Sequence, residues 1–503
     1  MNFSSSAFSS QDACAKTRAL AFVEASLVFL LSCLAFFICF DIESLPLGAD
    51  GYFHFVMASK LSLGNLAQSV EALPFTLLGK EGPDHHWLTH WMQKPFTLIS
   101  EENGISYAAV LWAAVVPAIL SALMRLEGVA YAGVFAIVGV WGLYLLPDRL
   151  LMFRAQNSAI IMVVVLGLLM ASRSYIKLAI FTFFFAHAYQ GVILAGVTGI
   201  AALIAHRLVN AEYDRQMVVA CLGGFLLALL TSPWFPENIS YFTVMMLGRL
   251  ISPIDDVSLM GTEWVPVPFE LLFQLGFVGH FCLIASWVII FFSRRKDYSR
   301  DTFTYALVFA LTATLFLFLY ARHWRMGELY GPLSAVALGF SSSLLVNKAR
   351  KKYLPALVFF IIVVTFLHQV LKHPEYPSHE LKFEGHCQYL NDRAEIGDTV
   401  LNLSWSSFPF LYYCSPQLVY AAGLDGLMLA HGDPDVFRVW YLLGNQRLEE
   451  LDAIAVISLF EKIGVQFIIF APEDAMSVSW LLRHAPESEV LHADSDGILV
   501  QVR

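Results

Sequence analysis

The stretch ALAFVEASLVFLLSCLAFFICF, residues 19–40, decides the fold class of this chain. About 20 predominantly apolar residues are enough for a helix to cross the hydrocarbon core of a bilayer. The stretch is longer than the apolar part of a signal peptide, and the following DIESLPLG lacks the small-residue pattern of a cleavage site. We therefore interpret residues 19–40 as a retained membrane anchor.

The composition extends this interpretation to most of the chain. Of 503 residues, 57% are hydrophobic and 14% are charged, whereas an ordinary soluble domain has about 25% charged residues. The net charge of −10 is opposite to that of a surface that follows nucleic-acid phosphates, which excludes nucleic acid as a partner. The sequence predicts a polytopic α-helical membrane protein whose first partner is the lipid bilayer.

Basic side chains predict the topology, because Lys and Arg concentrate at the cytoplasmic ends of spans. Neighbouring basic clusters must then be separated by an even number of passes. We predict spans near 19–40, 105–124, 127–146, 157–172, 216–232, 267–293, 303–320, 328–346 and 354–371, and a hairpin between 177 and 207, for about eleven transmembrane helices. The hairpin breaks near AHAYQG, residues 186–191, and is too short to cross the membrane fully. It should border a cavity, because irregular backbone at membrane depth must be buried in protein or line water.

The polar segments give the domain organisation. We expect a cytoplasmic N-terminal tip (1–18), a transmembrane domain (19–371) with outer loops 41–104 and 233–266, and a periplasmic domain (372–503), all in a bacterial inner membrane. In the last segment, DTVLNLSW, QLVYAAGL, VQFIIFAP and GILVQVR favour β-strands, while DPDVFRVWYLLGN and LDAIAVISLFEKIG have helical spacing. Their alternation predicts a small α/β domain. Cys387 and Cys414 in this domain could form a disulfide or remain free.

The first outer loop is rich in acids and histidines. Its segment DHHWLTHW places Asp84, His85, His86 and His90 close together, and Asp50 and His54 precede them in LGADGYFHFVMAS, residues 47–59. One hypothesis is a divalent-metal site, with Mg²⁺ or Mn²⁺ held by Asp50, Asp84, His85 and His86. The alternative is that these His and Trp side chains anchor a helix at the membrane surface.

Arginines on the predicted outer side run against the usual charge bias of membrane proteins. Arg154, Arg322 and Arg325 belong to this group. Binding of an anionic lipid phosphate would explain them, and an Arg325–Glu328 pair that stabilises a turn is the alternative.

These features together resemble the GT-C superfamily of integral-membrane glycosyltransferases. The resemblance consists of a first span, a loop that opens with ADGYFHF, many short spans, the turn ARHWRMGELYG before the penultimate pass, and a C-terminal α/β domain. Members transfer sugars from polyprenyl-phosphate lipids, and the most similar shape is the catalytic subunit of oligosaccharyltransferases. The resemblance covers the whole chain in architecture and a few short stretches in residues.

The resemblance also implies roles for individual residues. Asp50 matches the first-loop Asp that serves as general base or metal-associated carboxylate, Glu263 in MGTEW resembles the Glu of a flexible loop, and Arg325 resembles the Arg that meets the lipid phosphate. Where the oligosaccharyltransferase has an acidic pair, this chain has Gln156 and Asn157. The Trp-Trp-Asp acceptor motif is missing, so the resemblance does not extend to asparagine glycosylation.

The functional hypothesis is a glycosyltransferase with a polyprenyl-(di)phosphate donor and an extracytoplasmic acceptor. Asp50 and Glu263 would be catalytic; the phosphate and substrate would be bound by Arg325, Arg322, Arg154, His54 and Tyr52. We expect Asp50 and the late arginines to face one hollow. The alternative for Asp50 is a helix cap at GYFHFVMASKL. Alternative functions are an O-antigen ligase or polymerase of another fold, and a transporter or structural membrane protein.

Overall fold

A computed structural model of the chain describes residues 5–40, 48–62, 70–79, 84–99, 104–143, 145–248, 264–293, 298–345, 354–370 and 382–502. The chain divides into two units. Unit 1 contains residues 1–45, 101–228 and 263–377, and unit 2 contains residues 46–100, 229–262 and 378–503. The predicted catalytic residue Glu263 lies outside the described residues.

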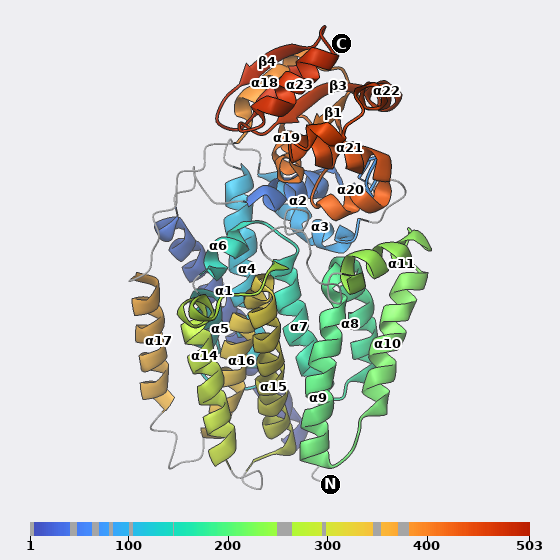
Figure 1. The fold of residues 1–503 in the computed structure, drawn as a ribbon. Coiled ribbons are helices and arrows are strands. Elements are labelled where there is room, and N and C mark those ends of the chain that lie inside the picture. Colours follow the sequence, from blue (N-terminus) through green and yellow to red (C-terminus); the bar gives the residue numbers. More distant parts are fainter. Residues whose placement is uncertain are drawn as a thin grey trace. The chain divides into compact units, whose positions relative to one another are not determined.

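Unit 1 is a bundle of apolar helices that run side by side (Figure 1). Its helices are α1 (Ser5–Cys39), α4 (Gly104–Leu126), α5 (Ala132–Trp141), α6 (Leu146–Leu151), α7 (Gln156–Ala171), α8 (Tyr175–Ala188), α9 (Leu194–Asn210), α10 (Arg215–Leu230), α14 (Phe269–Phe292), α15 (Arg300–Arg322), α16 (Gly327–Ser342) and α17 (Leu354–Val370). Five segments are long and apolar enough to cross a membrane: Ala15–Cys39, Gly104–Leu126, Gln190–Asn210, Phe269–Phe292 and Arg300–Arg322. The membrane character of the chain is therefore supported, but eleven crossings are not confirmed.

Several predicted spans form helices that are shorter than a full crossing. The predicted span 127–146 contains the 10-residue helix α5, and 328–346 contains the 16-residue helix α16, which is buried along its whole length. Small residues allow this burial, because a Cβ added at Gly139 of α5 would lie 3.1 Å from the Cα of Pro332 in α16. The two helices thus approach each other closely.

The predicted hairpin has its break where the sequence placed it. Helix α8 ends at Ala188, Tyr189 is extended, and a short 3-10 turn (Gln190–Ile193) precedes α9. Helix α8 has 14 residues, fewer than a crossing needs. The second arm, Gln190–Asn210, has 21 residues and is long enough to cross, so the expectation of incomplete crossing holds for the length of the first arm only.

Unit 2 contains a five-stranded sheet with the strand order β2-β1-β3-β5-β4. Its strands are β1 (Thr399–Asn402), β2 (Val419–Tyr420), β3 (Val465–Phe470), β4 (Glu489–Ala493) and β5 (Ile498–Gln501). Strands β1, β2 and β3 are parallel, and β5 pairs antiparallel with both β3 and β4. The sheet confirms the predicted C-terminal α/β class; strand β4 was not predicted, because its alternation is weak and its side chains are mostly exposed.

The helices of unit 2 come from three separate parts of the sequence. They are α2 (Gly48–Lys60), α3 (Trp87–Gln93), α11 (Glu237–Phe242), α18 (Glu384–Arg393), α19 (Phe408–Cys414), α20 (Gly426–Gly432), α21 (Pro434–Gly444), α22 (Ala453–Ile463) and α23 (Ala475–His484). One hydrophobic cluster combines Phe53 of α2 and Tyr241 of α11 with Leu411 of α19 and Phe467 of β3. The predicted outer loops therefore contribute to the same core as the C-terminal sheet.

A disulfide links two helices of this unit. Cys387 of α18 and Cys414 of α19 are bonded, with Cα atoms 5.9 Å apart. Of the two alternatives left by the sequence, the bridged form is confirmed.

Candidate functional site

Helix α2 carries the first group of candidate residues. It begins at Gly48, so Asp50 lies inside its first turn, where a carboxylate interacts favourably with the positive end of the helix dipole. Asp50 is therefore a first-turn charge and not the N-cap residue. At the other end of the helix, the Lys60 Nζ donates to the Tyr412 Oη at 2.9 Å and holds α2 to α19.

Two histidines and one aspartate form a buried chain of hydrogen bonds next to α2, which we call the relay (Asp84, His90 and His54). The Nδ1 of His90 lies 2.7 Å from the Oδ2 of Asp84, and its Nε2 lies 2.8 Å from the Nδ1 of His54. The exposed fractions of Asp84, His90 and His54 are 3%, 0% and 5%. The relay thus connects the start of α3 to α2 out of contact with bulk water.

The local backbone fixes the orientation of the Asp84 carboxylate. Its Oδ1 accepts the backbone N–H of His86 at 3.0 Å, and its carbonyl accepts the N–H of Trp87 at 3.1 Å. The carboxylate consequently presents Oδ2 to His90, which lies six residues later on α3.

The relay determines which nitrogen of His54 is basic when both rings are neutral. A carboxylate accepts a proton, so the Nδ1–H of His90 donates to Asp84 and its Nε2 must accept. The Nδ1–H of His54 then donates to His90, which leaves the lone pair on the Nε2 of His54. Asp50 precedes His54 by four residues and lies on the same face of α2. In this tautomer the basic nitrogen of His54 is Nε2, and His54 lies on the helix face that carries Asp50.

Sequence reasoning named His90 only as part of a histidine-rich loop. The structure assigns it the central position of the relay. The available signal was the carboxylate at Asp84, which comes just before the short helix of His90.

Tyr52 lies among aromatic rings on another face of α2. Its ring centroid lies 5.0 Å from that of Phe410 and 5.1 Å from that of Tyr413. Burial and the neighbouring Tyr413 raise the pKa of Tyr52 to about 12. Its hydroxyl therefore stays protonated at neutral pH and can donate to a substrate oxygen.

The residues predicted to bind a divalent metal do not supply the donors that Mg²⁺ or Mn²⁺ prefer. Mg²⁺ takes six oxygen ligands in near-octahedral geometry, whereas both oxygens of Asp84 accept hydrogen bonds from His86 and His90. The His85 ring stacks on Tyr241 at 4.8 Å between centroids, with its Nε2 3.3 Å from the Tyr241 Oη. The metal role of Asp50, Asp84, His85 and His86 stays a prediction.

A second group of candidate residues lies in unit 1, where Glu328 at the start of α16 binds two arginines. Its Oε1 accepts from the Nε of Arg149 at 2.6 Å and from the Nη2 of Arg154 at 2.9 Å. Arg154 is 2% exposed and Glu328 is 6% exposed. Glu328 thus holds both guanidinium groups at one carboxylate oxygen. Arg149 and Glu328 also line a small pocket, together with Leu143, Leu145, Leu275, Tyr320, Trp324 and Gly327.

The turn between α15 and α16 positions the other predicted arginines. Arg322 is in the last turn of α15, and the guanidinium carbon of Arg325 lies 5.6 Å from the ring centroid of Trp264. The Nδ1 of His323 lies 2.9 Å from the Trp264 carbonyl, and burial lowers the pKa of His323. The segment that contains Trp264 is therefore attached to the turn between α15 and α16 by both backbone and ring contacts. The alternative Arg325–Glu328 pairing stays a prediction.

Of the polar pair Gln156 and Asn157, Asn157 has a hydrogen-bond partner in the backbone. Asn157 is 1% exposed, and its Nδ2 donates to the Leu150 carbonyl at 2.8 Å. This contact closes the turn between α6 and α7.

Asp50 belongs to unit 2 and Arg325 to unit 1, so the expectation that they face one hollow stays a prediction. No protein-family model and no curated protein match the chain.

Proposed function

We propose that this chain is a membrane glycosyltransferase that moves a sugar from a polyprenyl-phosphate or polyprenyl-diphosphate donor to an extracytoplasmic acceptor. The observation that carries the proposal is the buried relay that ends on α2, one helical turn from Asp50. Such an arrangement supplies a carboxylate and an oriented imidazole at one place, which is what deprotonation of an acceptor requires.

The reaction needs little covalent chemistry from the protein. The acceptor X–H attacks the anomeric carbon of the sugar, a bond forms between X and that carbon, and the bond from the carbon to the phosphate oxygen breaks. The bonding electron pair leaves with the lipid phosphate, and the proton of X–H passes to the Asp50 carboxylate. The protein's tasks are to orient the acceptor, accept its proton and balance the phosphate charge.

The relay supports the base in two ways. Because His54 is held through His90 by Asp84, its ring keeps one orientation and one tautomer. Its Nε2 can receive the proton from Asp50 after transfer, which restores the carboxylate for the next turnover. Tyr52, whose hydroxyl stays protonated, would donate to the sugar or to the leaving phosphate.

Unit 1 supplies the cations of the proposal. Glu328 fixes Arg149 and Arg154, and guanidinium groups held in place in this way are suited to bind an anion such as a lipid phosphate. Arg322 and Arg325 add two more positive charges on the neighbouring turn. The five long apolar helices support a membrane location; a bacterial inner membrane with a cytoplasmic N-terminus and a periplasmic C-terminal domain is part of the proposal.

The decisive experiment is turnover by the Asp50→Asn variant. Purified protein would be given a polyprenyl-phosphate-linked hexose labelled in the sugar, with membrane extract as the source of acceptor, and release of polyprenyl phosphate would be measured. Loss of a general base lowers the rate by about 10²–10⁴-fold, and that range is our expectation. Asp435→Asn is the matched control, because Asp435 is also a first-turn acid of a unit 2 helix and is exposed.

The level of folded protein in the membrane must be measured beside turnover. Normal expression with lost turnover in Asp50→Asn supports the base. Normal turnover in this variant contradicts it and favours a ligase or polymerase of another fold, which does not need Asp50. If the unsubstituted chain releases neither polyprenyl phosphate from a monophosphate donor nor polyprenyl diphosphate from a diphosphate donor, the transporter or structural alternative is favoured.

A further inference from the structure

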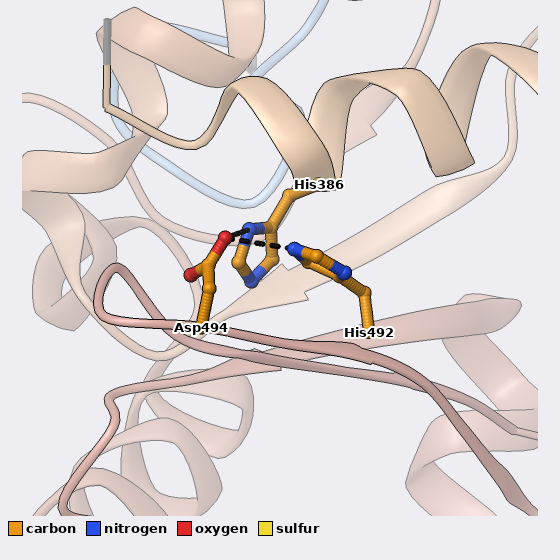
Figure 2. Close-up of side chains that lie close together, drawn as sticks. All are labelled: His386, His492 and Asp494. Carbon is orange, nitrogen blue, oxygen red and sulfur yellow. Dashed lines mark hydrogen bonds and ion pairs between the residues drawn. The ribbon is translucent and has the colours of Figure 1, made fainter. Parts of the chain in front are cut away.

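The hairpin of β4 and β5 carries a second group of imidazole and carboxylate side chains, separate from the relay. Its turn, residues 493–497, has the sequence ADSDG. His492 at the end of β4, Asp494 in the turn and His386 on α18 point toward one another (Figure 2). We call these three residues the hairpin triad.

The three side chains converge on one point. The Oδ2 of Asp494 lies 2.7 Å from the Nε2 of His492 and 3.6 Å from the Nδ1 of His386. One ligand atom from each residue lies within 4.8 Å of the others. A tetrahedral Zn²⁺ with bonds of about 2.0–2.1 Å separates its ligand atoms by roughly 3.3 Å. Small side-chain shifts would therefore bring all three atoms to coordination distance.

The position of His386 is costly without a further partner. The residue is 0% exposed, and among the described residues neither of its ring nitrogens has a hydrogen-bond partner. A bound cation would supply the buried ring with a partner.

The rest of the site is built around these groups. The Oδ1 of Asp494 accepts the N–H groups of Asp496 at 2.8 Å and Gly497 at 3.2 Å, which directs Oδ2 toward the two rings. Such contacts to a ligating carboxylate orient it for a metal. A Cβ added at Gly385 would lie 2.4 Å from the Nε2 of His492, so glycine at this position gives the ring its space.

We propose that the hairpin triad binds a first-row divalent cation, with Zn²⁺ as the preferred ion. Two imidazole nitrogens and one carboxylate oxygen suit Zn²⁺ and do not suit Mg²⁺ or Ca²⁺, which take oxygen ligands. Three protein ligands leave a fourth position for water. Asp494 is 33% exposed, which gives the ion a path from solvent.

The bound ion would attach the hairpin to α18. This helix already has a disulfide to α19 through Cys387, and the backbone N–H of Phe383 donates to the Oδ2 of Asp496 at 2.6 Å. A metal at the triad adds a bond between α18 and the edge strand β4. The site would therefore stabilise the outer edge of the sheet.

The test is metal binding by the full chain, purified in detergent without a histidine tag. Protein treated with a chelator and then dialysed would be titrated with Zn²⁺ at pH 7.5, with bound zinc per chain and thermal unfolding as readouts. We expect His492→Ala and Asp494→Asn each to lose one equivalent of zinc, or to bind it at least tenfold more weakly, since even outer-shell substitutions cost about 10–100-fold. Asn at position 494 keeps an oxygen for the Asp496 and Gly497 N–H groups, so the turn is preserved.

His431→Ala is the matched control, because His431 is an exposed histidine of the same unit. It should bind as much zinc as the unsubstituted chain, and Mg²⁺ at the same concentration should not raise the unfolding temperature. Equal zinc content and equal stabilisation in Asp494→Asn, His492→Ala and His431→Ala would overturn the proposal. Both triad variants change side chains that are partly exposed, so we expect them to fold. The unfolding temperature of each variant without metal tests this expectation.

Discussion

Unit 2 contains two groups of two histidines and one aspartate, and they are arranged differently. In the relay the groups are connected in series, from Asp84 through both nitrogens of His90 to His54. In the hairpin triad both rings converge on one oxygen of Asp494. The series arrangement leaves one basic nitrogen at its end and suits proton transfer. The convergent arrangement leaves a point between three donors and suits a cation.

Burial follows the same division. All three members of the relay are buried, whereas the triad combines a buried His386 with partly exposed His492 and Asp494. A group closed to solvent must satisfy its polar atoms internally. An ion can reach the partly exposed triad. That ion can also bind the buried His386 ring, whose nitrogens have no hydrogen-bond partner among the described residues.

The largest effect that tests this comparison is expected from His90→Ala. The substitution removes the middle of the relay, leaves the buried Asp84 carboxylate without its imidazole partner and creates a cavity. Removing one partner of a buried pair costs about 3–5 kcal/mol, and we expect a loss of this size in the free energy of unfolding. Urea unfolding followed by tryptophan fluorescence measures it.

His492→Ala in metal-free protein is the matched comparison for His90→Ala. It removes a ring that is 24% exposed, so its cost should stay below about 1 kcal/mol, as for other partly exposed hydrogen-bonded groups. Equal losses for the two variants would contradict the distinction between a closed relay and an open triad.

Metal removal should produce the next largest effect. A ligand present at 100 times its Kd stabilises the folded state by about 2.7 kcal/mol, so a chelator added to zinc-loaded protein should lower the unfolding midpoint accordingly. The chelator effect should persist in His90→Ala and become smaller or disappear in Asp494→Asn. A chelator effect that disappears in His90→Ala instead would place the metal at the relay.

The sequence predicted the classes of structure better than the contacts between distant segments. Long apolar runs predict helices wherever they occur, and four short apolar segments predicted strands β1, β2, β3 and β5. Length was predicted less well: the predicted span 127–146 contains α5, which has 10 residues.

The candidate site divides in the same way. Asp50, His54 and the histidine-rich segment could be named from the sequence, since outer-loop polar residues next to a span are unusual. The pairing of His54 with His90 depends on the packing of α2 against α3, which are separated by residues whose pattern gives no contact information. The triad was missed because His386 and His492 lie on separate elements that only the fold of unit 2 brings together.

A third carboxylate of unit 2, Asp474, gives the smallest predicted effect and sharpens the comparison, because amide groups donate hydrogen bonds to it. Asp474 accepts the N–H of Ala471 at 3.1 Å and the side-chain amide of Gln446 at 3.0 Å. Burial raises the pKa of Asp474 above its ordinary value of 3.8, although these hydrogen bonds oppose the shift. The folded state therefore binds this proton more tightly than the unfolded state.

The sign of the pH effect follows from that difference. The stabilising contribution of the protonated group is fully present below pH 3.8 and is lost as the pH rises through the raised pKa, so the ionised carboxylate lowers stability at pH 7. Asp474→Asn, which is neutral at every pH, should be more stable than the unsubstituted chain at pH 7 by up to about 1 kcal/mol. This advantage should shrink as the pH falls toward 4.

Urea unfolding at pH 7 and pH 4.5 measures the change, with Asp435→Asn as the control for loss of one exposed negative charge. If the stability advantage of Asp474→Asn instead grows as the pH falls, the amide partners alone hold the Asp474 carboxylate ionised. An imidazole partner would then not be what distinguishes Asp84 and Asp494 from Asp474.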